Sequence, residues 1–121
     1  LSLEEMSTRG LKWKNNVVIS SMCTVFAESE VVSLVAQNKD VADIIHGLNV
    51  SVASKVGALA ARLGQNNPGE YMMTGGVAQN QGIVEALEEK LGAKLYICDE
   101  AQLCGALGAA LFAYEKCQAA K

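Results

Sequence analysis

Short runs of β-branched and aliphatic residues alternate along this chain with longer segments whose apolar residues recur at helical spacing. This alternation constrains the fold more than any other feature of the sequence. It predicts strands at residues 16–20, 70–74 and 94–98, and helices at about residues 24–37, 40–63, 80–91 and 101–116. Strands that alternate with helices pair mostly in parallel, with the helices covering the sheet. We therefore expect an α/β fold in which ligands bind beyond the carboxyl ends of the strands, after Ser20 and after Thr74.

The segment that starts at Asp40 has the clearest helical pattern. Asp40 is a suitable N-cap residue, and Gly64 and Pro68 should end the helix. Its apolar side chains form one stripe, which we expect to face the core: Val41, Ile45, Leu48, Val52, Val56, Leu59 and Leu63.

The composition is that of a single folded domain. The chain has 121 residues, and a hydrophobic fraction of 50% with 19% charged residues excludes a disordered tail. A formal charge of −3, an aromatic fraction of 5% and scattered Lys and Arg residues argue against a nucleic-acid partner. No apolar run reaches the roughly 18 residues that a membrane span needs, so no membrane partner is expected.

The cysteines and the first ten residues indicate the cellular compartment of the protein. The four cysteines are irregularly spaced and include no CxxC pair, which favours a reducing cytoplasm over a disulfide framework. The first ten residues lack the pattern of a secretory signal. Because the chain does not begin with Met, we expect it to be a piece of a longer polypeptide.

A glycine pair follows the second predicted strand, in the sequence TGGVAQN at residues 74–80. Glycines between a strand and a helix let backbone N–H groups approach a ligand closely, and the helix N-terminus favours a negative charge such as a nucleotide phosphate. The alternative is that Gly75 and Gly76 only make a tight turn. The spacing matches neither a GxGxxG fingerprint nor a Walker A loop, so both interpretations remain open.

Cys23 follows the first predicted strand and lies close to the start of the next predicted helix. Backbone N–H groups and the helix dipole stabilise a thiolate at such a position, so Cys23 could be a nucleophile, a redox thiol or a metal ligand. It could equally be a buried, inert cysteine. A cysteine nucleophile needs a base, and the only histidine, His46, is more typical of a structural helix residue. Core packing or chance accounts for Cys98, Cys104 and Cys117.

Four motifs together are similar to those of one protein family. They are CTVFAESE at residues 23–30, SVASKV at 51–56, MTGGVAQN at 73–80 and GALGAALFAY at 105–114. Over residues 16–117 the chain resembles the activators of 2-hydroxyacyl-CoA dehydratases and the related ATP-hydrolysing subunits of benzoyl-CoA reductase.

The resemblance implies a fold and an activity. The fold would be a ribonuclease-H-like half of an actin-like, sugar-kinase-like ATPase, with a mostly parallel sheet flanked by helices. The activity would be that of a homodimer that binds ATP or ADP with Mg²⁺ and shares one [4Fe–4S] cluster between its subunits. It would pass an electron from a ferredoxin or flavodoxin to a 2-hydroxyacyl-CoA dehydratase or benzoyl-CoA reductase component. Cys23 would be a ligand of the cluster, and Gly75, Gly76, Val77 and Asn80 would contact the nucleotide.

The resemblance also implies that part of the machinery lies elsewhere. Residues 1–15 would be a linker or helix end from a missing N-terminal half, and residues 16–121 would be the C-terminal lobe. No cysteine precedes Cys23 to act as a second cluster ligand, and the phosphate-binding loops are missing, so this piece alone should be inactive. Two alternatives remain: a lobe of a sugar- or acetate-kinase-like ATPase with a structural cysteine, and a binding module without chemistry.

Overall fold

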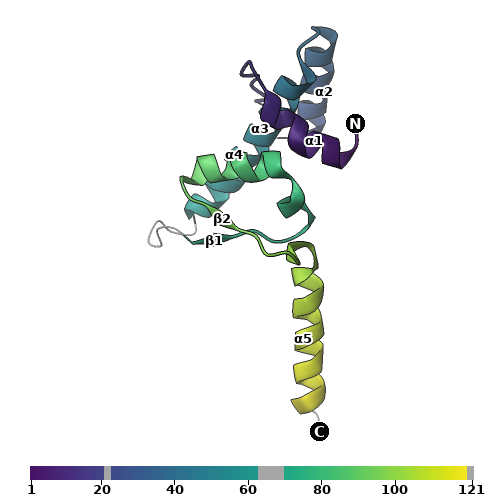
Figure 1. Cartoon of the computed structure of the whole chain (residues 1–121), viewed down its shortest axis with the longest axis vertical. Coiled ribbons are helices and arrows are strands. Elements are labelled where there is room, and N and C mark those ends of the chain that lie inside the picture. Colours follow the sequence, from purple (N-terminus) through teal and green to yellow (C-terminus); the bar gives the residue numbers. More distant parts are fainter. Residues whose placement is uncertain (21–22, 63–69, 120–121) are drawn as a thin grey trace.

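The computed structural model describes residues 1–20, 23–62 and 70–119 of the chain. Helices dominate it, and a small sheet lies beside them (Figure 1). The α-helices are α1 (Leu3–Arg9), α2 (Thr24–Ala36), α3 (Val41–Arg62), α4 (Gln81–Leu91) and α5 (Cys104–Ala119). The strands are β1 (Tyr71–Met72) and β2 (Leu95–Tyr96), and the 3₁₀ helices are η1 (Gly10–Lys12), η2 (Gly76–Gln79) and η3 (Ala101–Leu103). The predicted stop signals of the long helix, Gly64 and Pro68, lie outside the described residues.

The two strands form a parallel pair, with Tyr71 opposite Leu95 and Met72 opposite Tyr96. The Met73 N–H extends the pairing by donating to the Tyr96 carbonyl at 3.0 Å. A parallel pair needs a crossover connection, which η2 and α4 supply. The predicted α/β class with parallel strands is therefore confirmed, although each strand is shorter than predicted.

The prediction of a strand at residues 16–20 is wrong, because these residues form no strand in the structure. Val17 and Ile19 are buried and Val18 between them is 73% exposed, so the period of two that suggested a strand is real. The segment lies directly against α3, where a Cβ at Gly47 would collide with the Val17 carbonyl oxygen. Burial thus follows the expected alternation, but within the described ranges no neighbouring strand pairs with this segment.

The buried face of α3 matches the predicted stripe only in part, at Ile45. Val52 and Val56 of the expected stripe are 37% and 42% exposed, and Leu59 is 60% exposed. The buried positions of α3 are mostly smaller residues: Ala42, Asp43, Ile44, Ile45, Gly47, Asn49, Ala53 and Gly57. Small residues let α4 come close to α3, and Ala53 packs there with Ala86 and Leu87 of α4. Close approach of the backbones, rather than side-chain size, decides which face of α3 is buried.

Among the described helices, α3 has the length and apolar composition of a membrane-spanning helix, although the sequence contains no uninterrupted apolar run of that length. It nevertheless contacts α1, α2, α4 and η1, and it buries two polar residues, Asp43 and Asn49. The Asp43 carboxylate accepts hydrogen bonds from the backbone N–H groups of Lys14 and Asn15 at 2.7 and 3.0 Å. These contacts are those of a helix in a protein core.

Residues 1–15 pack against the rest of the chain. Ser2 and Glu5 form a capping box at the start of α1. The buried Ser7 hydroxyl accepts a hydrogen bond from the Gln81 N–H at 2.8 Å and so ties α1 to the start of α4. Farther along, the Trp13 ring stacks on His46 of α3, with centroids 4.1 Å apart and planes 8° from parallel.

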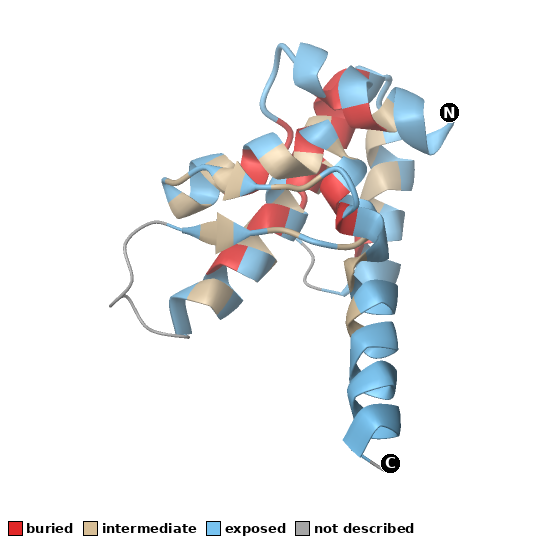
Figure 2. Ribbon diagram, turned by 60° about the horizontal axis from the view of Figure 1, so that its bottom comes forward, coloured by how far each residue is buried: buried red, intermediate tan, exposed pale blue. Residues whose placement is uncertain are grey.

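Two helices lie largely outside this core. Buried residues gather where α1, α3 and α4 meet, whereas α5 extends away from them and has no buried residue (Figures 1 and 2). In α2 only Ala27 is buried. The glycine-rich face of α5, which we expected to pack on a neighbour, is open: a Cβ at Gly105 or Gly108 would meet nothing within 4 Å among the described atoms.

Candidate functional site

The glycine pair forms the connection between β1 and α4. Gly75 has φ +92°, a backbone conformation that residues with a Cβ rarely adopt, so the turn itself requires glycine at this position. The Gly75 N–H donates to the Ala101 carbonyl at 2.7 Å, and the Gly75 carbonyl accepts from the Ala78 N–H at 3.1 Å. The turn therefore rests on η3, the segment that follows the second strand.

Gly76 differs from Gly75 in that the fold does not require it. Its φ lies outside the left-handed region, and among the described atoms a Cβ there would meet only Nε2 of Gln102, at 4.0 Å. The residue is exposed. Neither backbone conformation nor internal packing therefore accounts for the missing side chain, whereas a ligand lying against the backbone would.

Some of the other residues in the turn make structural contacts, and others are exposed to solvent. The Asn80 side-chain oxygen caps α4 by accepting from the Ile83 N–H at 3.1 Å. Val77 is 52% exposed, whereas Ala78 is buried. Gln79 Nε2 donates to Oε1 of Gln102 at 2.8 Å and so forms a second bridge to η3. Residue patterns in the sequence could not reveal this support, because backbone carbonyls and distant partners leave no periodic signal.

Cys23 lies where the sequence predicted, at the N-cap of α2. Its carbonyl accepts the Ala27 N–H at 3.0 Å, and the side chain makes no capping hydrogen bond. The residue is exposed, so the alternative of a buried, inert cysteine does not hold. Cys23 is not part of the glycine turn: α2 packs on α3, whereas η2 packs on η3 and α4.

The remaining candidates have different surroundings. His46 is half-buried under the Trp13 ring, in agreement with a structural helix histidine. Cys117 is exposed near the end of α5. Cys98 and Cys104 are half-buried, and their sulfur atoms are 3.6 Å apart. Their spacing in the sequence does not predict this proximity, which arises because residues 98–104 turn back on themselves through η3.

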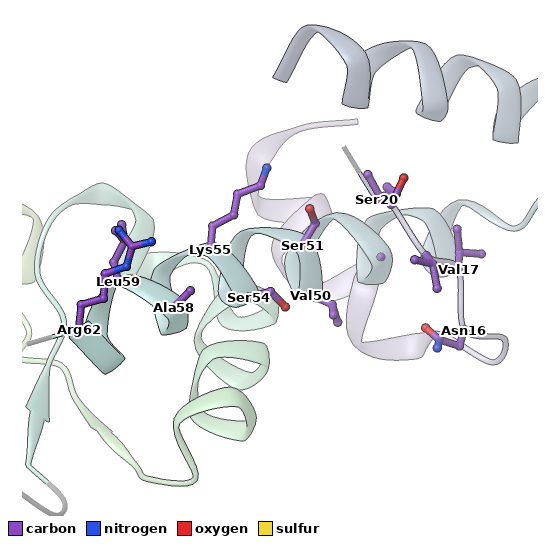
Figure 3. A pocket seen from close by; sticks show the side chains of 13 residues that line it. Asn16, Val17, Ser20, Val50, Ser51, Ser54, Lys55, Ala58, Leu59 and Arg62 are labelled. Carbon is purple, nitrogen blue, oxygen red and sulfur yellow. The ribbon is translucent and has the colours of Figure 1, made fainter. Parts of the chain in front are cut away.

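A cavity of about 570 Å³ lies between residues 16–20 and α3 (Figure 3). Its lining includes Ser51, Ser54, Lys55 and Arg62 of α3, together with apolar side chains. Neither Cys23 nor the glycine turn lines it. The cavity therefore does not join the two candidate sites.

In the described part of the chain, no three His, Cys, Asp or Glu side chains are grouped so that they could hold a metal ion. A [4Fe–4S] cluster is usually held by four cysteine thiolates. Cys23 offers one exposed thiol at a helix N-terminus, which suits a single ligand of an anionic cluster.

The model of the BadF/BadG/BcrA/BcrD ATPase family matches residues 1–113 of this chain. The chain belongs to this family. A family relative, the (R)-2-hydroxyglutaryl-CoA dehydratase activating ATPase of Acidaminococcus fermentans, is 49% identical over 116 residues, which cover 96% of this chain and 44% of the relative. A subunit of benzoyl-CoA reductase from Thauera aromatica is 29% identical over 124 residues, covering 96% and 44%.

A solved structure supports the same assignment to the BadF/BadG/BcrA/BcrD family. The activator of the 2-hydroxyisocaproyl-CoA dehydratase from Clostridium difficile, with bound ADPNP, superposes with a TM-score of 0.87 and is 40% identical. The match covers 99% of this chain and 44% of the activator. The chain thus spans less than half of the length of these relatives and has the fold of the matching part. The predicted resemblance to dehydratase activators is confirmed.

Proposed function

We propose that this chain is the C-terminal lobe of a longer, ATP-dependent electron-transfer activator of a 2-hydroxyacyl-CoA dehydratase. Membership of an ATPase family and the likeness to an activator that holds ADPNP support the nucleotide. The coverage of 44% of each relative supports a longer protein. In this proposal residues 16–121 belong to the lobe, and residues 1–15 connect it to an N-terminal half.

The observation that carries the nucleotide site is the open face of Gly76. The fold explains glycine at Gly75 but not at Gly76, where a Cβ would approach only Nε2 of Gln102, at 4.0 Å, among the described atoms. We assign the space over Gly76 to the adenosine part of ATP or ADP, bound with Mg²⁺, with Val77 beside it and Asn80 fixing the start of α4. The bridges to Ala101 and Gln102 hold the turn in place for this contact.

The degree of identity favours a dehydratase activator over a benzoyl-CoA reductase component. The identity is 49% to the activating ATPase of Acidaminococcus fermentans but 29% to the benzoyl-CoA reductase component of Thauera aromatica, over similar spans. The proposed partner is accordingly a dehydratase that acts on a 2-hydroxyacyl-CoA thioester. The proposed electron donor is a ferredoxin or flavodoxin, and the proposed location is the cytoplasm.

Cys23 is the proposed contribution of this chain to a [4Fe–4S] cluster, which supplies one-electron transfer when bound. Its exposure permits a ligand that bridges two subunits, and the N-terminus of α2 adds a favourable dipole for an anionic cluster. In a homodimer, two-fold symmetry would bring two copies of Cys23 to one cluster. Two further cysteines would come from the N-terminal half.

Anaerobic reconstitution of the full-length protein with iron and sulfide tests the proposal. Cys23→Ser should abolish the charge-transfer absorbance of the cluster and activation of the dehydratase. Cys117→Ser, which removes another exposed thiol on a helix, should leave both intact and is the matched control. An unchanged cluster in Cys23→Ser would contradict the assignment. Phosphoryl transfer to a small substrate without bound iron would instead identify a kinase-like protein.

A further inference from the structure

Cys98 and Cys104 form a pair of neighbouring thiols at one end of the sheet. Their Sγ atoms are 3.6 Å apart, and Cys104 Sγ also lies 3.6 Å from the Glu100 carbonyl oxygen. Both residues are half-buried, so small molecules can reach them while the surrounding backbone holds them together. A disulfide bond is about 2.0 Å long, and the two sulfurs therefore need to approach by roughly 1.5 Å.

The residues between the two cysteines support the glycine turn. The Ala101 N–H donates to the Cys98 carbonyl at 3.0 Å, which starts the turn of η3. From the same segment, the Ala101 carbonyl accepts the Gly75 N–H at 2.7 Å, and the Gln102 side chain accepts from Gln79 at 2.8 Å. A bond between Cys98 and Cys104 would close a ring that contains Ala101 and Gln102, the two residues that make these contacts.

We propose that Cys98 and Cys104 are a redox-active dithiol, which a small-molecule disulfide such as glutathione disulfide converts to an intramolecular disulfide that restrains the glycine turn. This modification site is distinct from the proposed cluster ligand Cys23, and its formation does not depend on the proposed function.

The reaction consists of two thiol–disulfide exchanges. One protein thiol loses its proton and attacks a sulfur of the small disulfide, which forms a mixed disulfide and expels one small thiolate. The second protein thiol then loses its proton, attacks the mixed disulfide and expels the other small thiolate. The two protein thiols are oxidised by two electrons, and the small disulfide is reduced to two thiols.

Proximity should make the mixed disulfide short-lived. The second thiol acts at an effective concentration on the order of millimolar or higher, because a short chain segment tethers it. A hydrogen bond with Cys98 raises the pKa of Cys104, so a larger fraction of Cys104 stays protonated near neutral pH. The exchange should therefore accelerate as the pH rises.

Peptide mapping of the full-length protein after treatment with glutathione disulfide tests the proposal. No Lys or Arg lies between Lys94 and Lys116, so trypsin releases Cys98 and Cys104 in one peptide and Cys117 in another. The peptide with the pair should become lighter by two hydrogen atoms and carry no glutathione. The Cys117 peptide should carry a glutathione adduct. A stable glutathione adduct on the pair, or two unmodified thiols beside a modified Cys117, would overturn the proposal.

Single substitutions give the second readout. Cys98→Ser and Cys104→Ser should each retain glutathione on the remaining cysteine, because no second thiol can displace it. Cys117→Ser should oxidise as the unsubstituted protein does and is the control for loss of a thiol. Rapid loss of the adduct in both single variants would show that another thiol resolves it and would contradict the pairing.

Hydrogen exchange in residues 74–80 tests the restraint on the glycine turn. Oxidation should slow exchange there roughly threefold or more, because the ring keeps the Ala101 carbonyl opposite the Gly75 N–H. Oxidant should have no such effect on Cys98→Ser. If the disulfide forms without slowing this exchange, the proposed coupling to the turn is wrong. Neither measurement requires nucleotide, so failure of the proposed nucleotide site would not affect the result.

Discussion

Adjacent glycines have different roles at the scale of single residues. Gly75 needs its positive φ to make the turn, whereas Gly76 has an ordinary backbone and room for a Cβ, which would lie 4.0 Å from Nε2 of Gln102. The two positions therefore separate effects on folding from effects on ligand binding. A substitution at Gly75 strains the backbone, and one at Gly76 fills space that we assign to nucleotide.

Gly76→Val in the full-length protein should weaken ADP binding by about thirtyfold, or roughly 2 kcal/mol, because branched carbons would occupy the space of the adenosine part. Gly76→Ala should cause a smaller loss, since it adds only a Cβ. Both variants should unfold at the same temperature as the unsubstituted protein. Calorimetric titration with ADP gives the affinities. Equal ADP affinity in all three folded proteins would mean that the glycine pair serves only as a turn.

Helices are easier to predict than strands at the scale of elements. The helices predicted at residues 24–37 and 80–91 correspond to α2 and α4 within one residue at each end. Their signals are local, because a cap residue and a helical period suffice. Ser2 and Glu5 carry the same kind of signal for α1, a capping box that the prediction of a linker or helix end did not use.

Features that depend on distant partners could not be predicted. The run at residues 16–20 has the alternation of a strand, but sheet formation needs a neighbour that the pattern does not specify. The helical spacing of large apolar residues predicts a core stripe on α3, whereas small residues such as Ala53 lie against α4. At the candidate site, the sequence identified the turn and Cys23, but not the support from Ala101 and Gln102.

The buried carboxylate of Asp43 joins α3 to the segment that follows η1. Hydrogen bonds from the Lys14 N–H, the Asn15 N–H and the Asn15 side chain hold the pKa of Asp43 below its ordinary value. The ionised form is thus favoured more in the folded state than in the unfolded state. Its stabilising contribution is complete above the ordinary aspartate pKa and is lost as the pH falls through the lower pKa of the folded protein.

Asp43→Asn should therefore lower the urea midpoint of unfolding at neutral pH, and the difference from the unsubstituted protein should shrink in acid. Asp99→Asn removes an exposed carboxylate and should change the midpoint little at any pH. Unfolding curves followed by circular dichroism across a range of pH give both comparisons. A difference for Asp43→Asn that stayed constant down to strongly acidic pH would contradict this explanation.

Seen as a whole, the molecule exposes large apolar side chains on two helices, α2 and α5. Phe26 on α2 and Phe112 on α5 are 65% and 69% exposed, and neighbouring aliphatic side chains on both helices are also exposed. Extended apolar patches usually mark surfaces that another protein part covers. In the proposed activator, the N-terminal half and the second subunit are available to cover them.

The 121-residue chain by itself should consequently bind a hydrophobic dye and form aggregates of varied size, whereas the full-length protein should bind little dye and should not associate beyond the proposed homodimer. Phe26→Ser and Phe112→Ser should each reduce dye fluorescence, because both side chains are exposed and make little contribution to the core. Dye fluorescence and light scattering over a range of concentrations measure the two effects. A chain that stayed monomeric without binding dye would show that these helices need no cover.

The stacking of Trp13 on His46 gives the chain an internal optical probe. Trp13 is its only tryptophan, and the ring lies parallel to an imidazole with centroids 4.1 Å apart. Indole emission depends on contact with such a neighbour, so separation of η1 from α3 should change the intensity and wavelength of emission. Selective excitation of tryptophan in this chain would report the separation of η1 from α3, while far-ultraviolet circular dichroism would follow the helices as a whole. A difference between the two signals would show directly whether residues 1–15 detach before the core unfolds.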